Sequence, residues 1–227
     1  MHRVVPFDLN ALNIVIFDFT NSNGELRDVD LTNTEEFTNY ILAKLQENES
    51  LVGIGKYNED RNIYARSSLF CGTEVPRTVH LGIDIWAPAG TPVFTPLLSR
   101  VHSFANNAAF GDYGPTIILE HIINGVQFYT LYGHLSLSSL AHLHVGAVFE
   151  AGKQIAAIGT HPTNGSWPPH LHFQIITDMQ GKKGDYPGVA SLTERKRYLE
   201  LCPDPNLILG IRQLLPTVPV LTSPVLL

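Results

Sequence analysis

The chain has 227 residues, of which 44% are hydrophobic and 16% charged, and its formal net charge is −6 at pH 7. This length is sufficient for one domain with a sizeable hydrophobic core, or for one domain with an appendage. The acidic balance and the lack of a dense basic patch argue against a nucleic-acid partner. The two cysteines, Cys71 and Cys202, are too few for a disulfide framework or a cysteine metal site, and we expect both to be reduced.

Residues 1–70 predict a small N-terminal α/β appendage. Residues 11–20 are rich in β-branched and aromatic side chains, which is typical of a strand. The run Asn33-Thr-Glu-Glu36 predicts a helix start of the capping-box type. Apolar side chains then recur with helical spacing, and we expect the helix to end near Asn48; they are Phe37, Tyr40, Ile41 and Leu45. We find no recognisable catalytic motif in this region.

Residues 71–180 predict a mainly β domain with an antiparallel sheet as its core. Glycine, proline and asparagine turns separate short apolar or alternating runs, a pattern that favours antiparallel strands over alternating βα units. Asn124-Gly125 between two such runs is the strongest hairpin signal in the chain. The runs are Thr116–Ile123, Val126–Leu135, Gln154–Gly159 and Leu171–Thr177.

Residues 181–227 predict a short C-terminal helix followed by an extended tail. Ser191-Leu-Thr-Glu194 is a second possible capping box, and the helix is expected near Arg195–Leu201. Pro203 and Pro205 are expected to end it.

The two ends of the chain predict no transmembrane segment. The first residues contain no apolar run long enough for a signal peptide, which predicts a cytoplasmic protein. The apolar C-terminal tail is too short to span a bilayer and is interrupted by proline; the prolines are Pro216, Pro219 and Pro224.

The arrangement of four polar side chains carries the chemical signal. On a strand, alternate residues share a face, so His170 and His172 point the same way, and His80 and Asp84 do so elsewhere in the chain. Gly82 leaves room between the latter two. If antiparallel strands bring the pairs together, His80, Asp84 and one further imidazole form a catalytic zinc site with an open fourth position. The other histidine of the pair is then free to act as a base.

The remaining histidines differ in whether the sequence predicts a functional role for them. His134, in Leu131-Tyr-Gly-His-Leu135, ends a β run and is placed to stabilise a developing oxyanion. His142 and His144 form another His-x-His pair, but their loop offers no nearby carboxylate, so we do not expect them to bind metal. His121 alternates as part of a strand and has no assigned role. His2, His102 and His161 show no pattern that predicts a ligand.

Several separated motifs resemble peptidase family M23, which includes the lysostaphin-like and LytM-like zinc endopeptidases. They occur in the family's order between residues 78 and 177: His80-Leu-Gly-Ile-Asp84, Gly90-Thr-Pro-Val93, Tyr113-Gly-Pro-Thr-Ile-Ile-Leu-Glu-His121, Tyr132-Gly-His-Leu135 and His170-Leu-His-Phe173. The resemblance implies an antiparallel β core with one Zn²⁺ bound by His80, Asp84 and His172. It further implies that His170 is the general base, that His134 stabilises the tetrahedral intermediate, and that the substrate is a peptide or peptidoglycan-like molecule.

The sequence also departs from common family patterns. Thr163-Asn-Gly-Ser-Trp-Pro-Pro169 replaces the usual Gly-rich approach to the paired histidines, and Trp167 is expected to reshape one wall of the groove. The flanking segments resemble M23-like modules joined to aminotransferase-type enzymes. Two alternatives to a peptidoglycan peptidase therefore stay open: a catalytically silent binding or regulatory module, and a zinc hydrolase that acts on a different, intracellular substrate.

Overall fold

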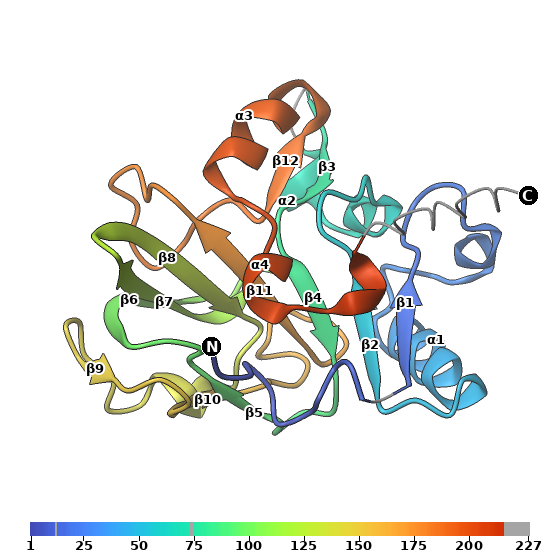
Figure 1. The fold of residues 1–227 in the computed structure, drawn as a ribbon. Helices are drawn as coiled ribbons and strands as arrows, with labels where there is room; N and C mark the ends of the chain where they lie inside the picture. Colours follow the sequence, from blue (N-terminus) through green and yellow to red (C-terminus); the bar gives the residue numbers. More distant parts are fainter. Residues whose placement is uncertain (12, 73–74, 216–227) are drawn as a thin grey trace, which may run out of the picture.

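The main sheet of the molecule contains eight strands and runs across the whole structure (Figure 1). The computed structural model describes residues 1–215, except residues 12, 73 and 74. Strands β1 and β2 pair in parallel, and all other neighbouring strands of this sheet are antiparallel. The expectation of a mainly β fold with an antiparallel core is therefore confirmed. In spatial order the strands are β1 (Ile14–Phe17), β2 (Val52–Gly55), β4 (Ile83–Trp86), β11 (His170–Ile176), β8 (Val126–Gly133), β7 (Gly114–Ile123), β6 (Ser99–Asn107) and β9 (Val148–Phe149).

Two smaller sheets and several short helices flank the main sheet. Strand β10 pairs with β5, and β12 pairs with β3, both antiparallel. These four strands are β10 (Gln154–Ala157), β5 (Pro92–Phe94), β12 (Val189–Ser191) and β3 (Arg77–His80). The α-helices are α1 (Thr34–Glu47), α2 (Ser68–Cys71), α3 (Arg195–Leu201) and α4 (Asn206–Leu209), and the 3₁₀ helices are η1 (Gly24–Asp28), η2 (Asn62–Arg66), η3 (Leu137–Leu140), η4 (Leu192–Glu194) and η5 (Arg212–Leu214).

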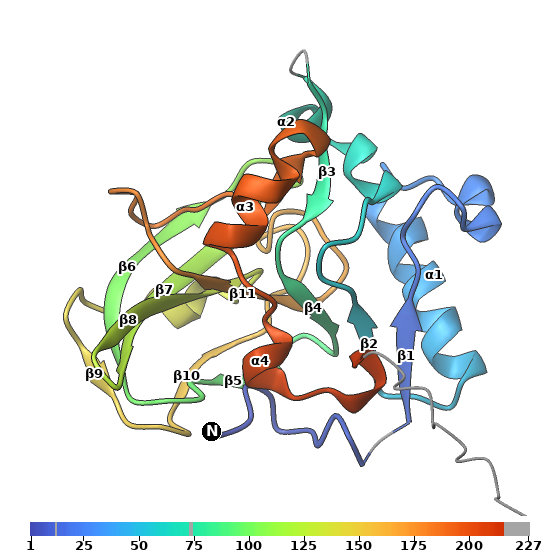
Figure 2. The same cartoon turned by 45° about the horizontal axis from the view of Figure 1, so that its top comes forward.

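The N-terminal region extends the main sheet. Strand β2 lies antiparallel beside β4, and α1 lies beside β1 and β2 at the opposite end of the sheet from β9 (Figures 1 and 2). The helix starts at the expected position because the Asn33 side chain accepts hydrogen bonds from the backbone N–H groups of Glu35 and Glu36. Its buried face packs with Phe17, Phe19 and Trp86 in one hydrophobic cluster.

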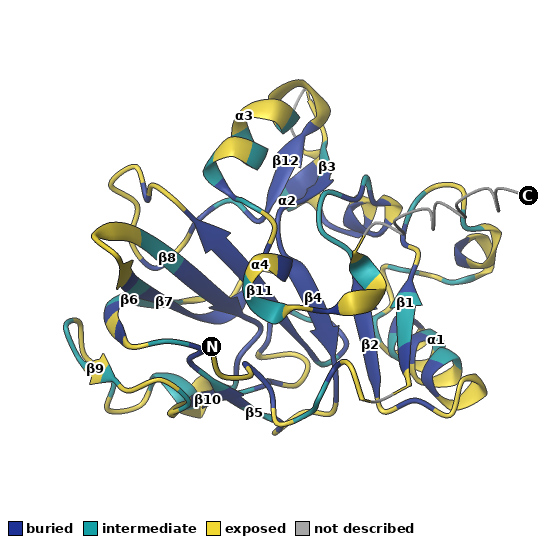
Figure 3. Cartoon of the chain, in the orientation of Figure 1, coloured by how far each residue is buried: buried dark blue, intermediate teal, exposed yellow. Residues whose placement is uncertain are grey.

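The central strands are the most deeply buried part of the molecule (Figure 3). Every residue of β4 and of β11 is buried, which indicates that both faces of the sheet are covered there. Ile85 and Phe173 belong to the largest hydrophobic cluster and are fully buried. Burial of such side chains contributes about 1.5–3 kcal/mol each, so the strands that carry the candidate ligands are held firmly in place.

Most of the predicted elements are confirmed, with local differences. Asn124 and Gly125 both have positive φ angles, 51° and 79°, and they connect β7 to β8 as a tight hairpin. Helix α3 spans the predicted residues, although Ser191 caps the 3₁₀ helix η4 immediately before it. Helix α4 and η5 lie where an extended tail was expected. The tail's last residues, 216–227, lie outside the described part of the chain.

Two further expectations concern the organisation of the chain. Strands β1 and β2 join the main sheet, β12 pairs with β3, and the Arg195 side chain donates to the Asn58 side chain, so all three predicted regions contact one another. The division at residues 70 and 180 stays a prediction. Among the described residues, no helix is both long enough and apolar enough to cross a membrane.

Candidate metal centre

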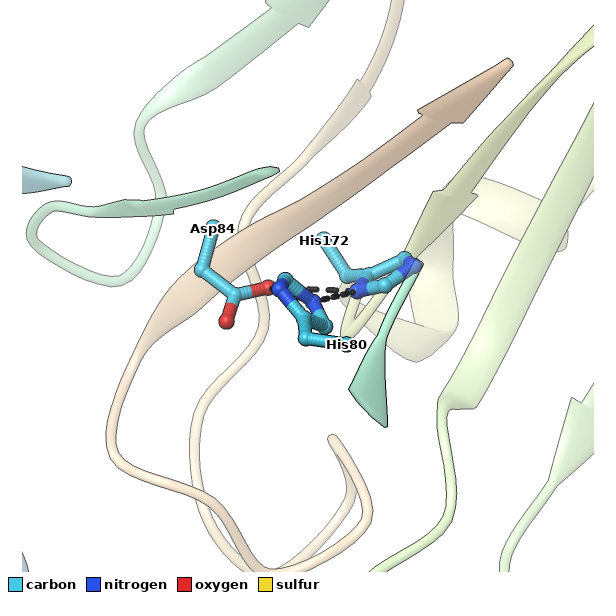
Figure 4. Close-up of side chains that lie close together, drawn as sticks. All are labelled: His80, Asp84 and His172. Carbon is cyan, nitrogen blue, oxygen red and sulfur yellow. Dashed lines mark hydrogen bonds and ion pairs between the residues drawn. The ribbon is translucent and has the colours of Figure 1, made fainter. Parts of the chain in front are cut away.

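Three strands from two distant parts of the chain bring His80, Asp84 and His172 together. Asp84 lies opposite His172 in the β4–β11 pair, and His80 is the last residue of β3. A continuous strand over residues 80–84 was expected, but the chain leaves one sheet at His80 and enters another at Ile83. Figure 4 shows the three side chains converging. Within the described part of the chain, this is the one group of three histidine, cysteine or acidic side chains able to hold a metal ion.

The ligand atoms of the three side chains lie within a small volume. Asp84 Oδ1 is 3.2 Å from His80 Nε2 and 3.1 Å from His172 Nδ1. The two imidazole nitrogens are 3.0 Å apart. All three residues are at most 3% exposed. These atoms are placed to surround a single cation.

The opposite nitrogen of each imidazole is bound to an oxygen that fixes its tautomer. His80 Nδ1 donates to the Lys56 carbonyl at 2.9 Å, because a carbonyl can only accept. His172 Nε2 donates to Gln174 Oε1 at 2.9 Å, and the Gln174 amide nitrogen donates to the Pro187 carbonyl, which sets the orientation of the amide. His80 Nε2 and His172 Nδ1 therefore both present lone pairs to Asp84 Oδ1.

This set of donors fits a zinc ion. Three acceptors that face one another without a shared proton repel, and a cation between them removes that repulsion. Two imidazole nitrogens and one carboxylate oxygen match the ligand types of a catalytic zinc site, in which the fourth position is open. The structure thus brings the three sequence-predicted ligands together.

The electrostatics of the site favour a neutral His80 and an ionised Asp84. Burial, with a smaller effect of Arg61, lowers the pKa of His80 to about 3. Burial would raise the pKa of Asp84, but His80 and Arg61 more than offset it, so this pKa lies well below its ordinary value of 3.8. Neutral imidazole and ionised carboxylate are the forms that bind a metal ion.

His170 and His134 lie next to the three ligands, on the same side of the sheet. His170 Nδ1 donates to the Pro168 carbonyl at 2.8 Å, and its Nε2 is 3.9 Å from Asp84 Oδ1. His134 Nδ1 donates to the Asn164 carbonyl at 2.8 Å. The two rings are 4.2 Å apart between centroids. Burial lowers the pKa of His170 to about 4, and burial together with the neighbouring His170 holds the pKa of His134 well below its ordinary value.

A pocket opens beside these histidines. Its volume is about 280 Å³, slightly below the usual range of roughly 300–1,000 Å³ for ligand pockets. His134, His170 and His172 line it together with the aromatic side chains Tyr113 and Trp167. The pocket therefore offers a binding space with aromatic and charged walls next to the candidate ligands and bases.

Three residues around the site carried no prediction. Tyr113 stood in a recognised motif without a role, and its hydroxyl is 3.5 Å from His172 Nε2. Trp86 stacks on the His170 ring, with centroids 4.1 Å apart and planes 20° from parallel. Arg61 donates to Asp84 Oδ2 at 2.5 Å. Tyr113 stands in one of the quoted motifs, whereas Trp86 and Arg61 lie outside all of them.

The other sequence expectations about histidine and cysteine concern residues away from the site. His142 and His144 are absent from the metal-ligand group of the described residues. His121 Nδ1 donates to the Leu98 carbonyl at 3.0 Å, and its Nε2 is 2.7 Å from the Thr130 hydroxyl. Cys71 and Cys202 are free, as expected.

Comparisons with known proteins found similarity to one peptidase family. Residues 78–185 match the model of peptidase family M23. The DD-carboxypeptidase/endopeptidase Mpg of Neisseria meningitidis is 34% identical over 131 residues, which are 56% of this chain and 28% of that protein. The chain thus spans less than a third of the length of this curated relative.

Solved structures of peptidases were also matched. The catalytic domain of lysostaphin from Staphylococcus simulans is 27% identical, with 52% of this chain and 80% of that chain covered and a TM-score of 0.35. A zinc-containing peptidase from Vibrio cholerae is 29% identical, with 43% and 27% covered and a TM-score of 0.33. The family match is confined to residues 78–185, slightly less than half of the chain, and it makes this segment similar to peptidase family M23.

Proposed function

We propose that this chain is a zinc-dependent hydrolase that cleaves a peptide (amide) bond. The observation that carries the proposal is the convergence of two imidazole lone pairs and one carboxylate oxygen within 3.2 Å of one another. His80, Asp84 and His172 would hold the ion. Zinc bound there would polarise a substrate carbonyl as a Lewis acid and make water acidic enough to attack near neutral pH.

His170 is the proposed general base. Its Nδ1 proton is committed to the Pro168 carbonyl, so its Nε2 lone pair is free to accept a proton from the attacking water. The low pKa of about 4 keeps this nitrogen unprotonated at neutral pH. After the attack, the same nitrogen returns the proton to the leaving amine. The stacking of Trp86 on the ring holds it in one orientation throughout.

Two groups are candidates for stabilising the developing oxyanion. The neutral His134 ring carries its proton on Nδ1, which faces the Asn164 carbonyl, so its Nε2 can donate only if the ring becomes doubly protonated. The Tyr113 hydroxyl lines the same pocket and stays neutral, because burial holds its pKa well above the ordinary value of 10. We therefore propose Tyr113 as the principal donor, and His134 would contribute only in its doubly protonated form.

The proposed substrates are peptides and peptidoglycan-like molecules. This choice follows the family match and the name of the Neisseria relative. The pocket of about 280 Å³ and its aromatic lining are compatible with a short segment of such a substrate.

The proposal is tested by metal analysis and product analysis on the same protein. We expect purified protein to contain about one zinc per chain and to release peptide fragments from a panel of peptides and muropeptides. His172→Ala is expected to lose both zinc and turnover, whereas His170→Gln should keep zinc and lose turnover. Full activity after complete removal of zinc would contradict the proposal. Peptide binding with zinc bound but without cleavage would instead identify a catalytically silent module.

A further inference from the structure

We propose that Arg61, fixed by Glu59, is a positioning residue for Asp84 and selects which carboxylate oxygen faces the metal site. This inference rests on the proposed zinc site. Arg61 and Glu59 both lie upstream of residues 78–185, the part of the chain that matches the family model. The metal site is therefore completed by a segment outside that domain.

The two oxygens of Asp84 have different partners. Arg61 Nη1 donates to Oδ2 at 2.5 Å, whereas Oδ1 faces His80 and His172 (Figure 4). A carboxylate that is free to rotate about its last torsion can offer either oxygen or both to a cation. With Oδ2 bound to the guanidinium, only Oδ1 is available. Arg61 thus restricts Asp84 to a single ligand atom.

Arg61 can impose this restriction because it is itself immobile. Its Nε donates to Glu59 Oε2 at 3.0 Å, and its Nη2 donates to the Lys56 carbonyl at 2.9 Å. The guanidinium lies over the Phe19 ring, 5.3 Å from its centroid, and the residue is 1% exposed. A planar guanidinium binds several acceptors in one fixed geometry, which a lysine ammonium cannot reproduce.

The same short segment also orients a second ligand. The Lys56 carbonyl accepts from His80 Nδ1, and the Glu59 carbonyl accepts from the backbone N–H of His80 at 2.9 Å. Residues 56–61 thus contact two of the three proposed ligands. The partners of a metal ligand typically change metal affinity by about 10- to 100-fold when they are removed.

The backbone beside Arg61 leaves room for this contact. Gly55 lies opposite Asp84 in the β2–β4 pair. A Cβ atom at position 55 would be 2.8 Å from Arg61 Nη2 and 3.2 Å from the Asp84 carboxylate, so any other residue would disturb the contact. The glycine, the arginine and the glutamate together form a support for the metal ligand that the N-terminal region provides.

Zinc titration and cobalt spectroscopy of the whole chain test the inference. The variant Arg61→Lys keeps the positive charge but removes the planar guanidinium and its several N–H donors. We expect this variant to bind zinc about 10- to 100-fold more weakly than the wild type. Cobalt(II) in place of zinc should show an altered visible spectrum in this variant, because the coordination of Asp84 changes. A purely structural role of Arg61 would lower stability without changing the cobalt spectrum.

Arg66→Lys is the matched control. Arg66 is also buried, but its side chain donates hydrogen bonds to Thr34 and Ser166, neither of which is a proposed ligand. It should keep the zinc affinity and the cobalt spectrum of the wild type. Wild-type values for both measurements in Arg61→Lys would overturn the inference and leave the proposed function intact. Failure of the wild type to bind zinc would overturn the proposed function and the inference with it.

A second variant decides the question if Arg61→Lys does not fold. Glu59→Gln keeps the shape of the side chain but removes the charge that holds Arg61. We expect a several-fold loss of zinc affinity and a cobalt spectrum shifted in the same direction, because Arg61 is then held less firmly. Zinc affinity and a cobalt spectrum identical to those of the wild type would refute the positioning role.

Discussion

Gly82 sets the space available to the His172 ring, and its replacement by alanine should weaken zinc binding. A Cβ atom at this position would lie 2.5 Å from His172 Cε1, 2.6 Å from Nε2 and 2.9 Å from the Phe173 carbonyl oxygen. Carbon atoms in contact normally lie about 3.5–4.0 Å apart, so the ring would have to move by about 1 Å. Nε2 would also lose its hydrogen bond to Gln174, which fixes the ring's tautomer.

The expected loss of zinc affinity depends on whether the steric overlap is larger in the zinc-bound or in the zinc-free protein. Without metal, the ring can turn away and relieve the overlap. With metal, Nδ1 must return to the position that it shares with His80 and Asp84, so the penalty falls on the zinc-bound state. Overpacking of this kind costs about 1–3 kcal/mol, which corresponds to roughly a 5- to 150-fold loss of zinc affinity.

Competition titration with a zinc chelator of known affinity measures this loss directly. Gly24→Ala is the control, because a Cβ atom there would meet nothing within 4 Å and should leave the affinity unchanged. Circular dichroism of both variants verifies that the fold is retained. A zinc affinity of Gly82→Ala within about twofold of the wild type would refute the view that His172 is a ligand held in this orientation.

Three further predictions concern stability and reactivity. Burial lowers the pKa of His121 below its ordinary 6.5, so the unfolded chain takes up a proton at higher pH than the folded chain, and the free energy of unfolding should fall as pH drops through about 6.5. In urea titrations His121→Gln should lose less stability than the wild type between pH 7.5 and 5, and equal losses would contradict this reasoning. Cys71 is exposed, whereas Cys202 is buried and its burial raises the pKa of the thiol to about 12. Iodoacetamide should therefore label only Cys71 in the native protein. Mass spectrometry that found both cysteines labelled equally fast would contradict this prediction. Asn33→Ala removes the cap of α1 and should cost about 1 kcal/mol of unfolding free energy, whereas an unchanged denaturation midpoint would show that the cap contributes nothing.

The sequence predicted the local elements around the site because their signals are local. Alternation placed His170 and His172 on one face, and Asn124-Gly125 predicted the hairpin that aligns β7 with β8. The register of β4 against β11, by contrast, has no local signal in the sequence. The pairing of Asp84 with His172 depends on residues 88 positions apart, and the resemblance to a known family, not periodicity, supplied it.

The features that escaped prediction depend on context. Helix α3 ends before Pro203 and Pro205, as expected, but a further helix after them was not expected. Pro205 stands at the N-cap of α4, where a missing backbone N–H costs little. Gly82 was expected within one strand, whereas it lies between two strands of different sheets. Arg61 has no periodic or motif signal, since its role depends on the contact between β2 and β4.

The N-terminal region supports the candidate site through two sets of contacts. The sequence predicts this region as an appendage, but in the structure it packs against the candidate site. Arg61 holds the Asp84 carboxylate, while Phe17 and Phe19 pack against Trp86, the ring on which His170 stacks. One contact restrains a proposed ligand and the other restrains the proposed base. A site whose ligand and base must both be held within about 0.5 Å needs such support from rigid elements. Residues 78–185 supply the chemical groups, and residues upstream of them hold two of these groups in place.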